Sequence, residues 1–378
     1  MLIKQKYIHI KEKNKVMATQ NTSRQAGKGK NKAKKTRNIV ILVIEVLVLA
    51  LMLGVLWFVT KATDEDTGIQ RVEIPEEDIE VNEGVEENEN LEKYRTIALF
   101  GLDSTVGELK QNTRSDTIMI ASINSETKEV RLMSVYRDTY LNLGNDTYNK
   151  CNAAYAKGGP KQAINMLNMN LDLDITDFAA VGFKGVIDVV DAVGGVWIEV
   201  DSAELEHINN YQISISENLK TDYVPVKTTG LQKLNGLQAT AYCRIRYTAG
   251  DDFKRTERQR EVLQAIMEEA KDLDVASLTK IANNVFGNFY TSVDLEEVIS
   301  LLSDLPSYTI IDEGGFPSND FRTGATIGGI GDSVICTDLE KAVVDFHKRF
   351  FQDEEYAVSD TLKGISQTIH ANTDAYVR

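Results

Sequence analysis

The chain has 378 residues and a formal net charge of −15 at pH 7, which suits one large domain or two ordinary ones with appendages. Residues 1–38 are basic, with Glu12 as their single acid, so the remainder is strongly acidic. That remainder lacks the broad basic surface of a nucleic-acid-binding domain, so no nucleic acid is expected as a partner.

An apolar run follows the basic segment, over 39–60. As a helix it is about 31 Å long, which matches a hydrocarbon core of about 30 Å. Trp57 and Phe58 close the run where a cleaved signal peptide would carry small residues, which favours a retained transmembrane helix. Lysines and arginines precede the run and acids follow it, so 1–38 is predicted to be a cytoplasmic tail and the rest to lie outside the membrane.

The remainder is predicted to divide into three parts. Residues 61–92 are acidic and poor in apolar side chains, which predicts a disordered linker. A globular domain is expected over 93–355. Residues 356–378 show no periodicity and are expected to form a flexible C-terminal tail.

Within the domain, apolar strand patterns alternate with helical spacing. Strands are predicted at 96–102, 116–123, 129–135, 196–200, 241–247, 308–311 and 333–336, and helices at 160–171, 183–193, 234–241, 253–273, 277–289, 294–304 and 337–351. Residues 201–229 are polar and predict a loop or an edge hairpin. Strands interleaved with helices indicate an α/β fold, a three-layer α/β/α sandwich with a central mixed sheet, preceded by the single transmembrane helix.

Two aspartates stand at strand ends. Asp103 follows the first strand and Asp116 begins the second, so both carboxylates can share one edge of the sheet. Paired carboxylates beside phosphate oxygens are the ligands that magnesium prefers. The alternatives are a turn-forming role for Asp103 and ion pairs of these acids with Arg114 and Arg137.

Arginines are spread along the sequence in a pattern that suits a diphosphate. Arg244 and Arg246 are two apart and would point the same way on a strand, which is unfavourable without an anion between them. Arg255, Arg258 and Gln259 share one face of a helix; the ordinary alternative is a solvated face. Asp251 and Asp252 are predicted to cap that helix.

Several other chemistries have little support. There are three cysteines, Cys151, Cys243 and Cys336, which leaves open one disulfide with a free thiol or three buried thiols. Four histidines and no phosphate-binding loop motif argue against a serine–histidine–aspartate triad and against P-loop nucleotide hydrolysis.

Taken in order, a set of short motifs resembles the LytR-CpsA-Psr family over about 95–270. They are Gly101-Leu102-Asp103, Arg114-Ser115-Asp116-Thr117, Arg137-Asp138-Thr139, Lys150 with Asn152, Ala154 and Tyr155, Gly158-Gly159, Asp191 with Gly194-Gly195-Val196, Leu234 with Gly236 and Ala239, Arg244 with Arg246, and Arg255 with Arg258-Gln259. One departure is Tyr136, where the family commonly has proline. Another is the stretch 201–229.

The resemblance implies a magnesium-dependent phosphotransferase on the outer face of a Gram-positive cell membrane. Such proteins move a glycopolymer from an undecaprenyl-pyrophosphate carrier onto peptidoglycan through a phosphodiester, and hydrolyse the pyrophosphate without acceptor. Carried over by position, Asp103 and Asp116 hold Mg²⁺, and the pyrophosphate is bound by Arg114, Arg137, Arg244, Arg246, Arg255 and Gln259. Arg258 and Asn152 are also expected to contact substrate. Asp138 is a candidate base beside the catalytic Arg114 and Arg137.

Two other hypotheses remain open at this stage. One is a non-catalytic sensor that binds a lipid pyrophosphate or a glycan. The other is a scaffold that contacts envelope proteins through 308–378.

Overall fold

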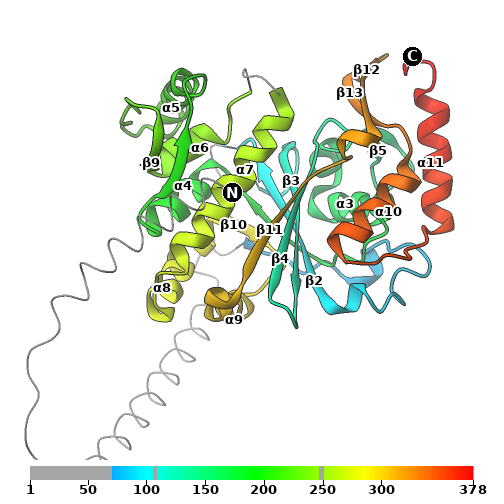
Figure 1. Ribbon diagram of the computed structural model, residues 1–378, viewed down its shortest axis with the longest axis horizontal. Coiled ribbons are helices and arrows are strands. Elements are labelled where there is room, and N and C mark those ends of the chain that lie inside the picture. The colour runs from blue at the N-terminus through cyan, green and yellow to red at the C-terminus, as the bar shows by residue number, and fades with distance from the viewer. Residues whose placement is uncertain (1–69, 105–108, 247–250, 378) are drawn as a thin grey trace, which may run out of the picture. The chain divides into compact units, whose positions relative to one another are not determined.

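The computed structural model describes residues 70–104, 109–246 and 251–377. Within them a seven-stranded sheet forms the centre (Figure 1), in the order β1-β10-β7-β2-β3-β4-β11. Parallel pairs (β1·β10, β7·β2 and β4·β11) mix with antiparallel pairs. The strands are β1 (Gln70–Arg71), β2 (Tyr94–Leu102), β3 (Ser115–Asn124), β4 (Glu129–Val135), β7 (Asp177–Val181), β10 (Phe289–Thr291) and β11 (Thr309–Phe316).

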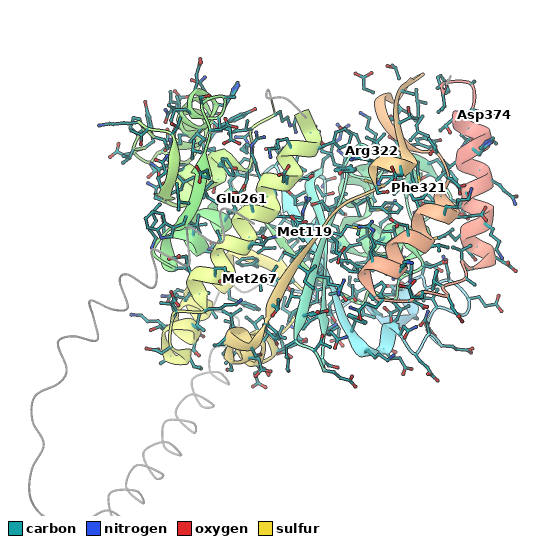
Figure 2. The ribbon with its side chains drawn as sticks, in the orientation of Figure 1. Met119, Glu261, Met267, Phe321, Arg322 and Asp374 are labelled. Atoms are coloured by element: carbon teal, nitrogen blue, oxygen red, sulfur yellow. The ribbon has the colours of Figure 1, made fainter. Side chains whose placement is uncertain are left out.

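Alternate side chains of the central strands enter two different apolar cores. Phe100, Ile120 and Met133 belong to one core, whereas Met119 and Leu132 belong to the other. Met119 lies in the middle of the sheet (Figure 2). Since successive strand residues point to opposite faces, the sheet is buried on both sides.

Helices cover both faces (Figure 1). Side chains of α3 (Ala153–Leu171), α10 (Leu339–Phe350) and α11 (Asp360–Thr373) fill the first core. The second core takes side chains from α4 (Phe183–Ala192), α5 (Leu205–Leu219), α6 (Gly236–Tyr242), α7 (Asp251–Ala270) and α8 (Val275–Val285). The predicted α/β fold with a central mixed sheet is confirmed.

The remaining elements are α9 (Leu295–Asp304) and three two-stranded pairs, β5 (Tyr140–Asn142) with β6 (Tyr148–Lys150), β8 (Val196–Val200) with β9 (Gly230–Leu234), and β12 (Arg322–Ile327) with β13 (Gly331–Cys336). The predicted transmembrane helix over 39–60 lies outside the described residues. Among the helices that are described, none combines the length and apolar character needed to cross a bilayer.

Two predictions in the middle of the chain are wrong. The stretch 201–229 contains the helix α5 in place of a loop or hairpin, because Ile208 and Ile215 bury one face while polar residues cover the other. The predicted strand over 241–247 is absent from the part of it that the structure describes, 241–246. A capping box between Asn235 and Gln238 starts α6, which runs to Tyr242 and ends in a turn.

The predicted disordered linker over 61–92 is wrong for its described part, 70–92. Val85 and Leu91 are buried in the first core. The buried Asn82 side chain donates to the Asp172 carboxylate at 2.6 Å and to the Met169 carbonyl at 2.9 Å. These contacts offset the conformational entropy that is lost when this acidic segment becomes ordered.

The predicted flexible tail over 356–378 is also wrong for its described part, 356–377. Ser359 caps α11 by accepting the Leu362 N–H, and Leu362, Ile365 and Ile369 are buried against the first core. The three cysteines are all free thiols; Cys151 and Cys336 are buried and Cys243 is partly exposed.

His347 joins α10 to the end of α3. Its side chain is fully buried, Nε2 lies 2.8 Å from the Leu171 carbonyl, and the ring stacks on Tyr356 at 3.6 Å. Burial lowers the pKa of His347 from 6.5 to about 4. The folded protein therefore favours the neutral ring. The resulting stability is fully present above pH 6.5, the pKa of an unperturbed histidine, and it is lost as the pH falls from there through about 4, the pKa in the folded protein.

We expect unfolding free energy to fall by about 3 kcal/mol between pH 6.5 and about 4 from this residue. Chemical denaturation across this pH range measures it. His347→Gln should flatten the profile, while the control His370→Gln, whose side chain is 68% exposed, should leave it unchanged. Identical profiles for His347→Gln and the parent chain would contradict this account.

Candidate functional site

A β-bulge near the start of β3, an interior strand of the sheet, sets the direction of the Asp116 side chain. Gly101 pairs with Thr117, but Leu102 pairs with Ser115, so Asp116 is the extra residue of β3. Bulges re-aim side chains in this way beside functional sites. A Cβ on Gly101 would lie 2.7 Å from Thr117 Oγ1, which explains the need for glycine opposite the bulge.

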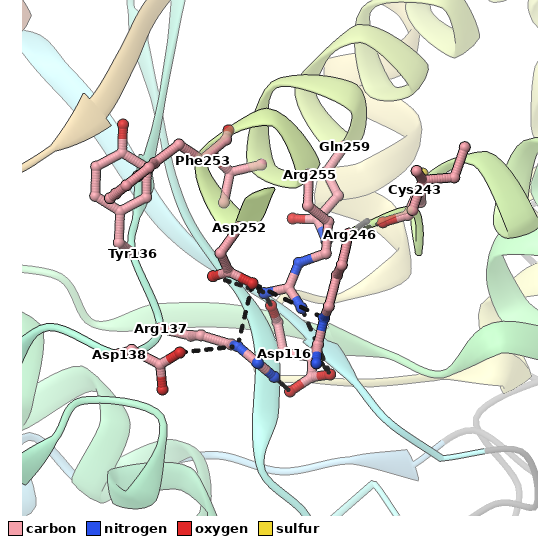
Figure 3. A network of polar contacts seen from close by, with 12 residues as sticks. Asp116, Tyr136, Arg137, Asp138, Cys243, Arg246, Asp252, Phe253, Arg255 and Gln259 are labelled. Carbon is pink, nitrogen blue, oxygen red and sulfur yellow. Dashed lines mark hydrogen bonds and ion pairs between the residues drawn. The ribbon is translucent and has the colours of Figure 1, made fainter. Parts of the chain in front are cut away.

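Three arginines converge on Asp116 (Figure 3). Arg137, just after β4, donates through Nη1 to Asp116 Oδ1 at 2.6 Å. Arg246, in the segment after α6, donates through Nη2 to Oδ2 at 3.0 Å. Arg255, on α7, donates through Nη2 to the Asp116 backbone carbonyl at 3.1 Å.

A second carboxylate, Asp252, holds the same three cations. Its Oδ1 lies 2.9 Å from Arg255 Nη2, 3.5 Å from Arg137 Nε and 3.8 Å from Arg246 Nε. Sequence reasoning gave Asp252 only a capping role and missed this one. The arginine cluster is hereafter Arg137, Arg246 and Arg255 with Asp116 and Asp252.

The charges of this cluster are strongly coupled. The pKa of Arg255 is lowered to about 10, chiefly by burial; Arg137 and Arg246 add to the lowering, and Asp252 opposes it. For Arg137, burial works in the same direction, but three carboxylates outweigh it and raise its pKa. Burial raises the pKa of Asp252, opposed by the arginines. At Arg255 an added anion would oppose the repulsion from Arg137 and Arg246.

The cluster also holds polar atoms with unused hydrogen-bonding capacity. Arg137 Nε, Arg255 Nε and Gln259 Oε1 are buried and have no hydrogen-bond partner among the described residues. Buried polar atoms are usually hydrogen-bonded, and the two arginine N–H groups among these atoms are suited to donating to an anionic ligand.

An apolar cavity of about 360 Å³ adjoins the cluster, between the sheet and α4, α6 and α7. Its charged lining residues are Arg246, Arg255, Asp116, Asp103 and Arg244, and its polar lining also includes Gln259, Thr117 and Thr240. The Arg244 guanidinium lies 4.5 Å above the Phe183 ring and 3.9 Å from Asp103 Oδ1. The apolar lining includes Leu99, Phe100, Met119, Val181, Phe183, Val186, Tyr211, Val262, Leu263, Ile266 and Phe289.

Most predicted site residues therefore meet, although Arg244 and Arg246 do so from the segment after α6 and not from a strand. Asp138 lies beside the cluster, 3.5 Å from Arg137 Nε and 3.1 Å from Lys150 Nζ. Asn152 is buried, and its backbone N–H donates to the Arg137 carbonyl at 3.1 Å. Arg114 is exposed and makes no ion pair within the described part of the chain.

Arg258 lies apart from the cavity, so the structure does not support its predicted substrate contact. Its side chain is 1% exposed; Nε donates to Glu204 Oε1 at 2.7 Å and Nη1 to the Ile245 carbonyl at 3.1 Å. Arg258 thus supports the backbone between Arg244 and Arg246 through its hydrogen bond to the Ile245 carbonyl, and it does not line the cavity. It differs from Arg255 and Gln259, which face the cavity from the same helix.

We expect Arg258→Met to reduce the unfolding free energy by about 3–5 kcal/mol, because it leaves the buried Glu204 charge without its partner. The control Lys254→Met breaks an exposed pair with Glu257 on the same helix and should cost under about 1 kcal/mol. Urea denaturation of both variants measures this. Loss of diphosphate binding by Arg258→Met at unchanged stability would restore the role predicted from the sequence.

A family model, the LytR_cpsA_psr family, matches residues 57–326. The chain belongs to this family. The match covers the bulge at Asp116, the arginine cluster and the apolar cavity.

Curated relatives carry both regulatory and transferase names. Biofilm regulatory protein A of Streptococcus mutans is 33% identical over 215 residues, which cover 54% of this chain and 51% of that protein. The polyisoprenyl-teichoic acid–peptidoglycan teichoic acid transferase TagU of Enterococcus faecalis is 29% identical over 271 residues, covering 69% and 81%. The chain thus spans about half the length of the first relative and four fifths of the second.

Solved structures share the fold. A crystal structure described as a transcriptional regulator from Enterococcus faecalis has a TM-score of 0.56 at 25% identity, covering 76% of this chain and 97% of that one. Bacillus subtilis TagT has a TM-score of 0.53 at 22% identity, covering 70% and 92%.

Proposed function

We propose that this protein transfers a glycopolymer phosphate from a polyprenyl-pyrophosphate carrier to peptidoglycan. The observation that carries the proposal is the junction of the arginine cluster with the apolar cavity. A prenyl diphosphate has the same two parts, a doubly charged head and an apolar tail. The transferase name of the relative TagU, which aligns over four fifths of its length, supports the same reaction class.

The cationic side chains suit phosphoryl transfer, which depends on positioning and on neutralising charge. Arg137, Arg246 and Arg255 present planar, always-charged donors to diphosphate oxygens. Asp116 and Asp252 orient these guanidinium groups before substrate arrives, so little reorganisation is needed in the transition state.

Magnesium fits the donor set. Asp103 and Asp116 both line the cavity, and Mg²⁺ is commonly held by one or two carboxylates together with substrate phosphates and water. Within the described residues no cluster of three or more acids, histidines or cysteines would hold a metal without such a substrate. When bound, the ion would act as a Lewis acid on the phosphate.

The transfer forms one P–O bond and breaks another. The acceptor hydroxyl oxygen attacks the phosphorus that carries the glycopolymer, and prenyl phosphate leaves. Asp138 is our candidate for accepting the hydroxyl proton, because it lies beside Arg137 at the edge of the cluster. The same site would hydrolyse the carrier when water takes the place of the acceptor.

The proposal includes the place of the reaction. We propose that the segment 39–60 tethers the chain to the outer face of the cell membrane. This would bring the apolar cavity within reach of carriers held in the bilayer.

Turnover of a polyprenyl pyrophosphate by the detergent-solubilised full chain tests the enzyme against a non-catalytic sensor. We expect magnesium-dependent cleavage of the diphosphate P–O–P bond that falls at least about 10-fold in Asp103→Ala, because a metal ligand is lost. The control Asp374→Ala removes an aspartate that directly follows α11 and whose side chain is 68% exposed, and it should retain activity. Tight binding without magnesium-dependent turnover would favour the sensor.

A further inference from the structure

A second cavity of about 360 Å³ lies beside the arginine cluster and is not used by the proposed carrier site. We call it the Arg322 pocket. Its walls come from α7, β11, the loop before β12 and α10, and they include Tyr136, Phe253, Lys254, Glu257, Arg260, Glu313, Ser318, Asn319, Arg322 and Arg349. Arg322 stands at the start of β12 (Figure 2).

Two aromatic rings hold Arg322 in place. Its guanidinium carbon lies 3.6 Å from the centre of the Phe253 ring and 4.7 Å from that of Tyr136. The two rings meet edge to face at 4.6 Å. The stacking fixes the cation but leaves its N–H donors unused, because aromatic faces attract the charge without accepting strong hydrogen bonds.

Arg322 differs from the other cations of the pocket. Arg260 is paired with Asp312 at 2.6 Å, Arg349 with Asp345 at 2.9 Å and Lys254 with Glu257 at 2.8 Å. Arg322 makes no ion pair within the described ranges, and its buried Nη1 has no hydrogen-bond partner there. A fixed, unpaired guanidinium in a cavity is suited to a carboxylate or phosphate oxygen.

The Arg322 pocket and the arginine cluster are connected through two pairs of residues that are adjacent in the sequence. Tyr136 precedes Arg137 in the chain, and Phe253 follows Asp252, so one residue of each pair lines the pocket while the other belongs to the arginine cluster. Figure 3 shows Tyr136 and Phe253 on one side of the cluster and Cys243, which lines the apolar cavity, on the other.

In-line phosphoryl transfer requires the attacking oxygen to approach opposite the leaving group. If the prenyl phosphate leaves toward the apolar cavity, the acceptor hydroxyl must arrive from the side of Tyr136 and Phe253. We propose that the Arg322 pocket binds a carboxylate of the acceptor saccharide and so presents its hydroxyl to the phosphorus. The inference rests on the proposed transfer function and adds an acceptor subsite to it.

The test is steady-state transfer by the full chain to a saccharide acceptor with free carboxylates, compared with the same acceptor after amidation. For the parent chain we expect the KM to be about 10- to 100-fold lower for the free carboxylate, the effect of one charge-assisted bond. Arg322→Gln should abolish this preference, while Arg322→Lys should retain part of it. Donor KM and acceptor-free hydrolysis should stay unchanged in both variants.

The control Lys341→Gln removes an exposed cation of α10, whose side chain is 76% exposed, and should keep the preference. Equal KM values for the two acceptors in the parent chain would overturn the subsite. A raised donor KM in Arg322→Gln would instead place the phosphates of the donor polymer in the pocket.

If the chain cleaves no carrier at all, the proposed function fails. Calorimetric titration of the carboxylated saccharide into the parent chain and Arg322→Gln then decides the pocket by itself, since equal binding refutes it.

Discussion

Arg246→Ala is expected to weaken binding of a prenyl diphosphate by about 100-fold while the unfolding free energy changes by under about 1 kcal/mol. The loss has two parts: a charge-assisted bond to phosphate worth about 1.5–3 kcal/mol, and the orientation of Asp116, which accepts from Arg246 at 3.0 Å. Stability should change little because the side chain is 32% exposed. Calorimetric titration and thermal unfolding of the full chain measure both quantities.

Arg95→Ala is the matched control. This arginine is 35% exposed and pairs with Asp177 and Glu297, away from the cavity, so its removal should leave diphosphate binding intact. Arg246→Lys should recover only part of the affinity, because a lysine cannot form the two parallel bonds of a guanidinium. A binding loss that follows global unfolding in every variant would refute the assignment of the site.

Val186→Trp is expected to reduce affinity for a long-chain prenyl diphosphate by about 100-fold. Val186 lines the apolar cavity from α4, and an indole there would displace about four methylene groups of the tail, at about 0.8 kcal/mol each. Inorganic pyrophosphate should bind as before, because the arginine cluster is untouched. Competition between the two ligands measures the selectivity directly.

Val189→Trp provides the comparison on the same helix, since Val189 does not line the cavity. It should leave the preference for the long chain unchanged. If Val186→Trp lowered the affinity for the long-chain prenyl diphosphate and for inorganic pyrophosphate equally, the cavity would not be the binding site of the prenyl tail.

Strong local patterns made much of the fold predictable. The strands β2, β3 and β4 appear within two residues of their predicted bounds, because their apolar runs are long and ended by turn residues. The strand β7 was missed: its five residues, Asp177–Val181, carry little signal, and pairing with β2 and β10 decides their conformation. The helix α11 did have a signal, the spacing of Leu362, Ile365 and Ile369 after Ser359.

The site was predictable in its residue types but not in its geometry. The alternation around Arg244 and Arg246 suggested a strand, yet the capped helix α6 extends to Tyr242, and the arginines reach the cavity from the segment after it. The spacing on α7 placed Arg258 with Arg255, but the buried Glu204 draws Arg258 to the far side. Local spacing cannot reveal such long-range partners. Asp252 was missed for the same reason, because one of its arginine partners, Arg137, lies more than a hundred positions away in the sequence.

A crystal structure of the full chain with a polyprenyl diphosphate tests the central claim most directly. The account predicts diphosphate oxygens within hydrogen-bonding distance of Arg137, Arg246 and Arg255, and the prenyl chain between the sheet and α4 and α7. Ligand bound at another surface, with Asp116 still holding its arginines and the apolar cavity unfilled, would contradict it.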